Sequence, residues 1–206
     1  MSGLILRACT ARLAPADAGR GGAVAIPGLE HLAPRARPPR LPVFCGDIPM
    51  RIARDGTWFY QGGPIGRKEL VCLFASVLRR EEDGGYWLVT PAERARIEVE
   101  DAPFLAVELF HCPPASRDCQ GQVISFRTNV DEVVSAGPAN PLRIARDAAS
   151  GAPIPYVLVR DGLEARINRA VYYELVALSV PEVVDGRRTL GVWSQGAFFP
   201  LGDPEA

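Results

Sequence analysis

One pattern of residues occurs twice in this chain, in two segments that lie far apart. Residues 53–70 read ARDGTWFYQGGPIGRKEL, and residues 159–175 read VRDGLEARINRAVYYEL. In each copy an Asp-Gly pair predicts a type I′ hairpin turn, and an apolar run with helical spacing follows it. Two copies are too few for a solenoid. We therefore predict a duplicated unit of strand, turn, strand and helix within a two-part fold.

The length and composition suit one large or two small domains made mostly of strands, and with the duplicated unit we expect an α+β protein of two small, mostly antiparallel β domains. The chain has 206 residues, 48% of them hydrophobic, with 19 prolines and 20 glycines, which suits short strands and many turns around a real core. Residues 1–40 are rich in Ala, Gly, Pro and Arg without any sustained period, so we expect a flexible tail there. We place the first domain at residues 41–92 and the second at residues 93–206.

Local patterns predict most of the individual elements. Apolar spacing predicts a helix that begins near Arg67 and ends at Gly84, and Asn168 is expected to cap a second helix that Pro181 ends. Thr90 to Glu93 has the form of a capping box, which predicts a short helical turn. Strands are expected at Met50–Gln61 (a hairpin), Tyr86–Val89, Arg96–Glu100, Phe104–Phe110, Gln122–Thr128, Val130–Ser135, Tyr156–Arg160, Leu163–Ile167, Leu190–Trp193 and Ala197–Phe199.

Charge and cysteine content limit the partners and the compartment. Residues 1–40 hold six arginines against Asp17 and Glu30, while the net charge of the whole chain is −1, so the remaining residues are acidic overall. An acidic body argues against general nucleic-acid binding, which needs a basic face. No apolar run is long enough to span a membrane. Five cysteines without paired spacing suit a reducing compartment, so we expect a cytoplasmic protein.

Two arginines define the candidate site, because Arg67 and Arg169 each stand at the start of a predicted helix. A cation is mildly unfavourable at that positive end, so either a carboxylate such as Asp55 or Asp161 offsets it or an anionic ligand does. Both explanations stay open. In the second, the two helix starts face a common positively lined cleft, to which Arg166 adds a cation.

The sequence does not indicate an enzyme. It has no nucleophile elbow, P-loop or dinucleotide-binding glycine motif, and its two histidines are His31 and His111. We predict no metal site, because His111 with Cys112 and Cys119 does not complete a tetrahedral set. A hydrolase that uses Glu98, Glu100 and Asp101 is an alternative, although a half-exposed strand with Ile97 and Val99 facing inward has the same alternation.

Four segments together resemble one bacterial protein family. They read CGDIPMRIARDGTWFYQGGPIGRKELVCLFASVLRRE, YWLVTPAERARIEVEDAPF, FRTNV and PYVLVRDGLEARINRAVYYELV. This series is similar to the domain of unknown function 1285 family. The resemblance implies two domains with an internal duplication, a C-terminal half like pleckstrin-homology domains, a nucleotide-like ligand at the junction of the halves, and a role in signal transduction. Positions that match the family are Arg54, Asp55, Trp58, Pro64, Arg67, Thr90, Glu93, Asp101, Thr128, Asn129, Tyr156, Arg160, Arg166, Arg169 and Tyr173.

We therefore expect a non-catalytic binding or sensor protein that holds a small anionic, nucleotide-like ligand between its two domains. The candidate ligand contacts are the cations Arg67, Arg166 and Arg169, the aromatic residues Trp58 and Tyr173, which would stack on a base, and Thr128 and Asn129, which the resemblance adds. No particular cofactor is indicated. The alternatives are a protein-interaction scaffold and the carboxylate- or metal-dependent hydrolase.

Overall fold

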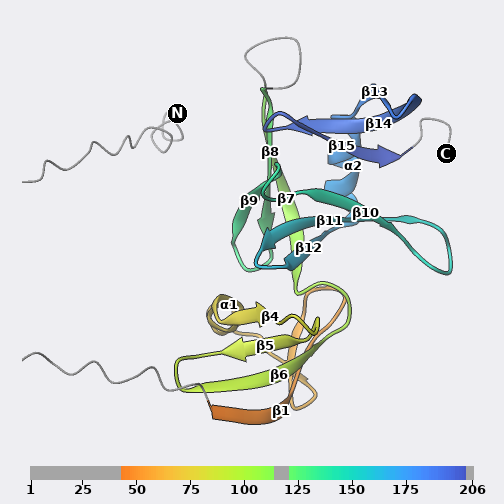
Figure 1. Cartoon of the computed structure of the whole chain (residues 1–206). Coiled ribbons are helices and arrows are strands. Elements are labelled where there is room, and N and C mark those ends of the chain that lie inside the picture. The colour runs from red at the N-terminus through yellow and green to blue at the C-terminus, as the bar shows by residue number, and fades with distance from the viewer. Residues whose placement is uncertain (1–42, 114–120, 203–206) are drawn as a thin grey trace, which may run out of the picture. The chain divides into compact units, whose positions relative to one another are not determined.

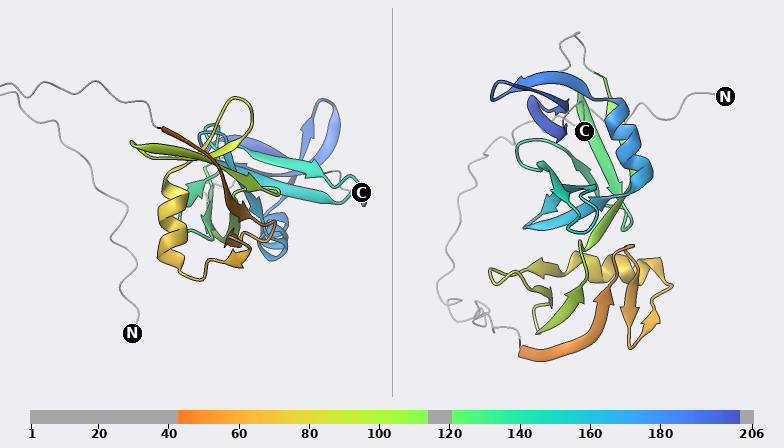
Figure 2. Two further views of the ribbon diagram at one scale, coloured as in Figure 1. Left: turned by 90° about the horizontal axis from the view of Figure 1, so that it is seen from below. Right: turned by 90° about the vertical axis from the view of Figure 1, so that its right-hand side faces the viewer.

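Two six-stranded sheets and one three-stranded sheet form in the residues that the structure describes, which are 43–113 and 121–202. The coordinates are a computed structural model. The expected N-terminal tail, residues 1–40, lies outside the described residues, and so does Cys119. All three sheets belong to one compact unit that begins at Arg40 (Figures 1 and 2). Two helices complete an α+β fold with two domains, as the duplicated unit predicts.

The first sheet has the strand order β3-β2-β1-β6-β5-β4. β1 and β6 run parallel at the centre of the sheet, while the other neighbouring strands are antiparallel. A parallel pair needs a long connection, and helix α1 with the β4–β5 hairpin lies within it. The bounds are β1 Val43–Ile52, β2 Trp58–Tyr60, β3 Gly63–Pro64, α1 Lys68–Ser76, β4 Leu78–Arg80, β5 Tyr86–Val89 and β6 Glu93–Val99.

The second sheet has the order β10-β11-β12-β7-β8-β9, and its parallel pair is β12 with β7. Helix α2 follows β12 and contacts β7, and a small sheet of two successive hairpins, β13-β14-β15, ends the described chain. The bounds are β7 Phe104–Cys112, β8 Val123–Thr128, β9 Val133–Ser135, β10 Leu142–Arg146, β11 Pro153–Arg160, β12 Leu163–Ile167, α2 Arg169–Ala177, β13 Val180–Val184, β14 Arg187–Ser194 and β15 Ala197–Gly202.

The first sheet extends further along the chain than the sequence indicates. Strand β6 lies between β1 and β5, so residues 93–99 belong with the first sheet, whereas the expected second domain begins at residue 93. The misleading signal is Thr90 with Glu93. Their mutual hydrogen bonds, Glu93 N–H to Thr90 Oγ1 at 3.0 Å and Thr90 N–H to Glu93 O at 2.9 Å, close the turn between β5 and β6. The predicted helical turn is therefore wrong.

The duplicated unit is present, but its two copies differ in their turns. Asp161 and Gly162 have φ values of 45° and 73°, which confirms a two-residue type I′ turn between β11 and β12. In the first copy Gly56 has a positive φ but Asp55 does not, so the predicted type I′ turn is wrong. There the Asp55 carboxylate accepts the Thr57 N–H at 2.9 Å and holds a longer loop.

Helix α1 is shorter than its apolar spacing predicts. It ends at Ser76, because Leu78 is fully buried as the first residue of β4, where it pairs with Leu88. Gly84 lies in the β4–β5 turn and does not end a helix. Leu73, expected on the buried face, is 60% exposed, whereas Ala75 is buried.

Helix α2 begins as predicted, since the Asn168 side chain accepts the Val171 N–H at 2.8 Å. Replacing Asn168 with alanine should lower the free energy of unfolding by about 1 kcal/mol, because that N–H loses its partner. The control is Arg67→Ala, since Arg67 holds the matching position before α1 and its side chain makes no cap hydrogen bond. Urea denaturation of both variants checks this, and equal losses in the two would contradict it.

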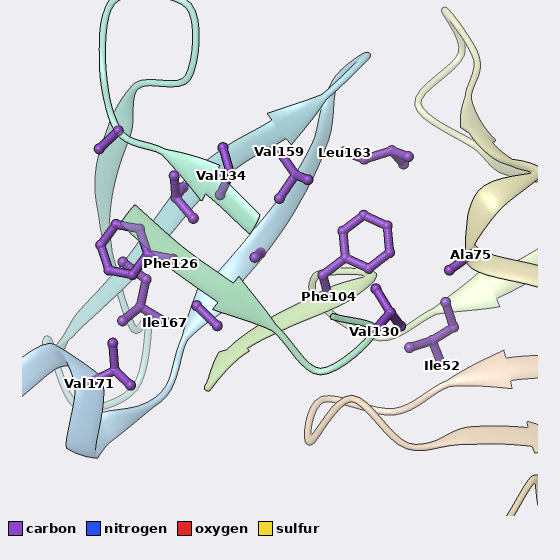
Figure 3. Packing of buried hydrophobic residues seen from close by; sticks show 14 of the residues in the cluster. Ile52, Ala75, Phe104, Phe126, Val130, Val134, Val159, Leu163, Ile167 and Val171 are labelled. Atoms are coloured by element: carbon purple, nitrogen blue, oxygen red, sulfur yellow. The ribbon is translucent and has the colours of Figure 1, made fainter. Parts of the chain in front are cut away.

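Buried side chains from both large sheets join in a single hydrophobic cluster. Figure 3 shows Phe104 near Ala75, Ile52 and Val130 on one side and near Leu163 on the other. Phe104 is 1% exposed and stands at the start of β7, directly after the segment that links the two sheets. The two domains therefore share apolar packing at their junction.

Candidate ligand-binding site

A cavity of about 500 Å³ lies in the second domain. Three of the seven predicted ligand contacts, Arg166, Arg169 and Tyr173, line it together. They are neighbours because β12 leads directly into α2, so the end of a strand and the first turn of a helix form one wall. The other lining residues are Asp147, Ser150, Ala152, Pro153, Ile154, Pro155, Ile167, Asn168 and Tyr172.

Arg166 is held in place by the segment that links the two sheets. Its Nη1 donates to Asp101 Oδ2 at 2.7 Å, and the Tyr156 hydroxyl donates to Asp101 Oδ1 at 2.6 Å. Burial, the hydrogen bond to Asp101 and the negative charge of Asp101 raise the pKa of Tyr156 to about 12, so this hydroxyl remains a donor at neutral pH. Arg166 thus meets the cavity with its charge already balanced by a carboxylate.

Arg169 has a different environment. Its Nε donates to the Tyr173 hydroxyl at 2.9 Å, one helical turn further on, and its guanidinium lies 5.5 Å from the centre of the Tyr173 ring. Among residues 43–113 and 121–202, no carboxylate pairs with Arg169. The Tyr173 side chain is itself 56% exposed. The cavity therefore combines a cation that has no carboxylate partner in the described ranges with an accessible aromatic ring.

Asp147 is the acidic residue in the cavity wall. Hydrogen bonds from the Ser150 N–H and hydroxyl, then from the Ala149 N–H, lower the pKa of its carboxyl group, and the positive charge of Arg54 adds a smaller effect. Asp147 is thus ionised and held by its own loop. Only second-domain residues line the cavity itself.

The other four predicted ligand contacts do not join this site. Trp58 is 1% exposed and lies 6.3 Å from Phe74, ring centre to ring centre, so it is part of the core and does not stack on a ligand. Thr128 is fully buried, and its Oγ1 accepts the Glu132 N–H at 3.1 Å. Arg67 is exposed before α1 and does not line the cavity that holds Arg166 and Arg169. The predicted common cleft of Arg67 and Arg169 is therefore wrong.

Asn129 connects the two domains. Its Oδ1 accepts the Leu105 N–H at 3.0 Å, and its Nδ2 donates to Gly56 O at 3.1 Å. A Cβ atom on Gly56 would lie 2.8 Å from that Nδ2, so the glycine is needed for the close approach. Both polar atoms of the Asn129 side chain are engaged, which gives this residue a role in the fold.

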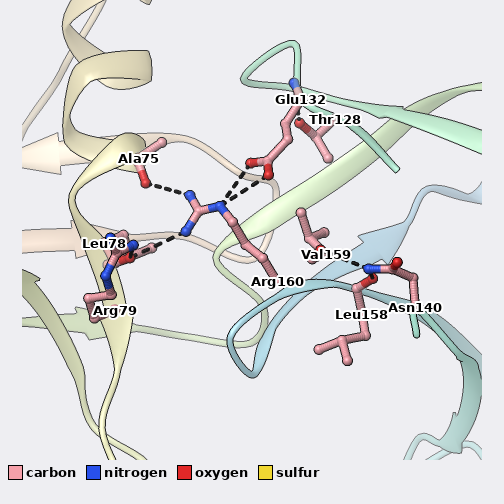
Figure 4. A network of polar contacts seen from close by, with 9 residues as sticks. All are labelled: Ala75, Leu78, Arg79, Thr128, Glu132, Asn140, Leu158, Val159 and Arg160. Atoms are coloured by element: carbon pink, nitrogen blue, oxygen red, sulfur yellow. Dashed lines mark hydrogen bonds and ion pairs between the residues drawn. The ribbon is translucent and has the colours of Figure 1, made fainter. Parts of the chain in front are cut away.

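A second connection between the domains centres on Arg160 (Figure 4). Its Nη2 donates to the Ala75 carbonyl at 2.8 Å, at the end of α1, and its Nε pairs with Glu132 at 3.0 Å. Nη1 makes a longer contact of 3.5 Å with the Leu78 carbonyl. One side chain of β11 thus contacts both the first domain and the turn between β8 and β9.

Two of the three carboxylates of the hydrolase alternative, Glu100 and Asp101, make other contacts. Glu100 pairs with the Arg51 guanidinium and accepts the Arg54 N–H at 3.0 Å, while Asp101 is held by Arg166 and Tyr156. Within the described ranges, no group of three His, Cys, Asp or Glu side chains is arranged to hold a metal ion. The geometry therefore gives the hydrolase alternative no support.

Another cavity, of about 640 Å³, lies on the first sheet. Arg51 and Arg96 line it, but so do Asp47 and Glu98, and Arg51 is already paired with Glu100. This wall has charges of both signs in equal number. It is therefore less suited to an anion than the cavity beside Arg169.

Sequence reasoning missed the loop of residues 147–152, which contributes Asp147, Ser150 and Ala152 to the cavity wall. The segment DAASGAP does carry a turn signal, since Asp147 is followed by Ser150 and Gly151. It also missed strand β10 immediately before this loop. If these residues had been predicted as a hairpin of β10 and β11, its turn would have contained Asp147.

The described chain is a two-domain α+β protein with a candidate anion site in its second domain. A family model described as "Domain of unknown function (DUF1285), N-terminal domain" matches residues 40–102, and one described as "Protein of unknown function (DUF1285), C-terminal domain" matches residues 103–201. The chain belongs to the DUF1285 family, which confirms the resemblance seen in the sequence.

Two solved structures are similar to this chain. A DUF1285 family protein from Silicibacter pomeroyi DSS-3 is 48% identical, with 84% of this chain and 93% of that chain covered and a TM-score of 0.71. A DUF1285 family protein from Shewanella baltica OS155 is 26% identical, with 63% and 91% covered and a TM-score of 0.48. A comparison with curated proteins gave no match. In the described part of the chain, neither helix has the length and apolar content needed to cross a bilayer.

Proposed function

We propose that this protein is a non-catalytic ligand-binding or sensor protein of the cytoplasm, with a role in signal transduction. It holds a small anionic, nucleotide-like ligand in the cavity of about 500 Å³ beside the start of α2, close to the junction of its two domains. The observation that carries this proposal is Arg169, which has no carboxylate partner among the described residues and lies against the exposed ring of Tyr173.

The chemistry of the cavity supports this ligand class. Its volume falls within the range of about 300–1,000 Å³ that is typical of small-molecule sites. A planar guanidinium matches the oxygens of a phosphate or carboxylate, and the aromatic face of Tyr173 suits a flat group such as a base. Ile154 and Ile167 are among the apolar residues of the lining.

We also propose that the second domain is pleckstrin-homology-like, as the family resemblance implies. The support is a mostly antiparallel six-stranded sheet followed by a helix that contacts β7. Superposition of residues 104–177 on solved pleckstrin-homology domains tests this proposal. A different strand order in the best superposition would contradict it.

Binding to Arg169 gives a direct test. A thermal-shift screen with nucleotides and aromatic acids should find a compound that raises the melting temperature of the wild type. A ligand present at one hundred times its Kd raises the free energy of unfolding by about 2.7 kcal/mol. In a chain of this size, each kcal/mol raises the melting temperature by about 2–4 °C. Arg169→Gln should weaken binding by at least about tenfold, which is about 1.4 kcal/mol.

The matched control is Arg188→Gln, which removes the same charge from an exposed position on β14 away from the cavity. Its affinity for the compound should equal that of the wild type. If no compound in the screen stabilises the wild type, or if both variants lose affinity equally, the proposal is wrong.

A protein-interaction scaffold is the second candidate, and one observation favours it. Strand β13 is an outer strand of the small sheet, and its Val183 is 69% exposed. An exposed edge strand with apolar side chains can pair with a strand of another chain. Under this alternative, Val183→Glu abolishes capture of an identified partner, and Arg169→Gln leaves that capture unchanged.

A further inference from the structure

Of the two arginines that line the cavity, Arg166 is paired with a carboxylate, whereas Arg169 has no carboxylate partner among the described residues. Arg166 is balanced by Asp101, as their distance of 2.7 Å shows. Asp147, the acidic residue of the wall, accepts hydrogen bonds from the N–H groups of Ala149 and Ser150 and from the Ser150 hydroxyl in its own loop. A ligand that binds here therefore meets one arginine that lacks a carboxylate partner, while the Asp147 carboxylate in the same wall disfavours a second negative charge.

Asp101 also restricts where a second negative charge could go. Its carboxylate is paired with the Arg166 guanidinium and is only 17% exposed. The Tyr156 hydroxyl donates a hydrogen bond to the other oxygen of the same carboxylate. A doubly charged ligand would have to share Arg166 with this carboxylate at close range. Like charges at such a distance repel strongly where water is partly excluded.

The rest of the lining favours an apolar body. Pro153, Ile154, Pro155 and Ile167 line the cavity together with the rings of Tyr172 and Tyr173. A flat group is well placed on these surfaces while a single acidic group meets Arg169. A polyphosphate, which needs several cations, does not fit this distribution.

We infer that the site selects a singly charged anion with a flat apolar body, and that Asp101 is the residue that sets this charge preference. Phosphodiesters such as cyclic mononucleotides and aromatic monocarboxylates belong to this class, whereas phosphate monoesters do not. The inference rests on the proposed function and adds the ligand charge and its determinant.

The test compares ligands that share a body and differ in charge. At pH 8, 3′,5′-cyclic AMP carries one negative charge and 5′-AMP carries about two, because the second pKa of a phosphate monoester is about 6. The pair 2-naphthoate and 2-naphthyl phosphate makes the same comparison without a base or sugar. Calorimetric titration of the wild type should give tighter binding of the singly charged member by about tenfold.

Asp101→Asn should remove this preference or reverse it, because Arg166 becomes available to a second negative charge. Asp185→Asn is the control, since it removes the same charge from the β13–β14 turn, where asparagine tolerates the φ of 52°. The double variant Asp101→Asn with Arg166→Gln restores the balance of charges. It should regain the wild-type preference for the singly charged ligand. Recovery in the double variant would show that the effect of Asp101→Asn is not a folding defect.

Each outcome has a separate meaning. If the wild type binds the doubly charged member as tightly as the singly charged one and Asp101→Asn leaves their ratio unchanged, the charge inference fails and the proposed binding function stands. If the wild type binds none of the four probes, the proposed function fails with it. If Asp185→Asn changes the ratio of the two affinities as much as Asp101→Asn does, the change is due to the net charge of the protein. That result would overturn the role of Asp101.

Discussion

Replacement of Trp58 with alanine should lower the free energy of unfolding by about 3–5 kcal/mol, as is usual when a large aromatic side chain is removed from a core. Trp58 is 1% exposed, and its ring lies nearly parallel to that of Phe74. The loss should appear as a lower urea midpoint with little change in slope. Ligand affinity, measured well below that midpoint, should stay unchanged because Trp58 does not line the cavity.

Trp58→Phe is the matched variant. The indole Nε1 is buried and has no hydrogen-bond partner among the described residues, so phenylalanine removes a poorly placed polar atom while most apolar contacts stay. Its cost should be below about 1.5 kcal/mol. A Trp58→Ala protein that keeps its stability but no longer binds ligand would show that Trp58 contacts the ligand after all.

Replacement of Arg160 with alanine should destabilise the protein by about 2–4 kcal/mol. The guanidinium is 25% exposed, donates to the Ala75 carbonyl at 2.8 Å and pairs with Glu132 at 3.0 Å. Its removal leaves the partly buried Glu132 carboxylate without its ion-pair partner and takes one donor from the Ala75 carbonyl at the junction of the domains. Urea denaturation, followed by the fluorescence of the tryptophans, measures the loss.

Lys68→Ala is the control, because Lys68 also joins the two domains by an ion pair. Lys68 and its partner Asp131 are 54% and 50% exposed, so water screens their attraction. This variant should cost no more than about 1 kcal/mol. Equal losses from Lys68→Ala and Arg160→Ala would mean that burial does not decide the strength of this junction.

Short-range signals predicted much of the fold. Asp161 with Gly162 makes the expected turn, and Asn168 caps the expected helix, because both effects depend on residues only a few positions apart. The parallel pairing of β1 with β6 joins segments that α1 and a hairpin separate, and no local pattern encodes it. Because this pairing adds residues 93–99 to the first sheet, the domain boundary predicted at residue 93 lies too early in the chain.

The candidate site divides in the same way. Arg166, Arg169 and Tyr173 lie within one strand-to-helix segment, so the sequence was able to group them. Asp101 is the partner of Arg166 through tertiary contact alone. Trp58 was misassigned because an aromatic residue beside a charged motif has the same appearance in sequence whether it faces a ligand or the core.

The contacts of Arg160 are chemically unequal on their two sides. Toward the first domain it binds main-chain carbonyls, of Ala75 and Leu78, which every amino acid provides. Within its own domain Arg160 binds the side chain of Glu132. An aspartate at position 132 would be too short to reach the guanidinium, and a neutral residue there would not balance its charge. Relatives are thus free to vary the end of α1 so long as its packing is kept, whereas Arg160 and Glu132 are expected to change only as a pair.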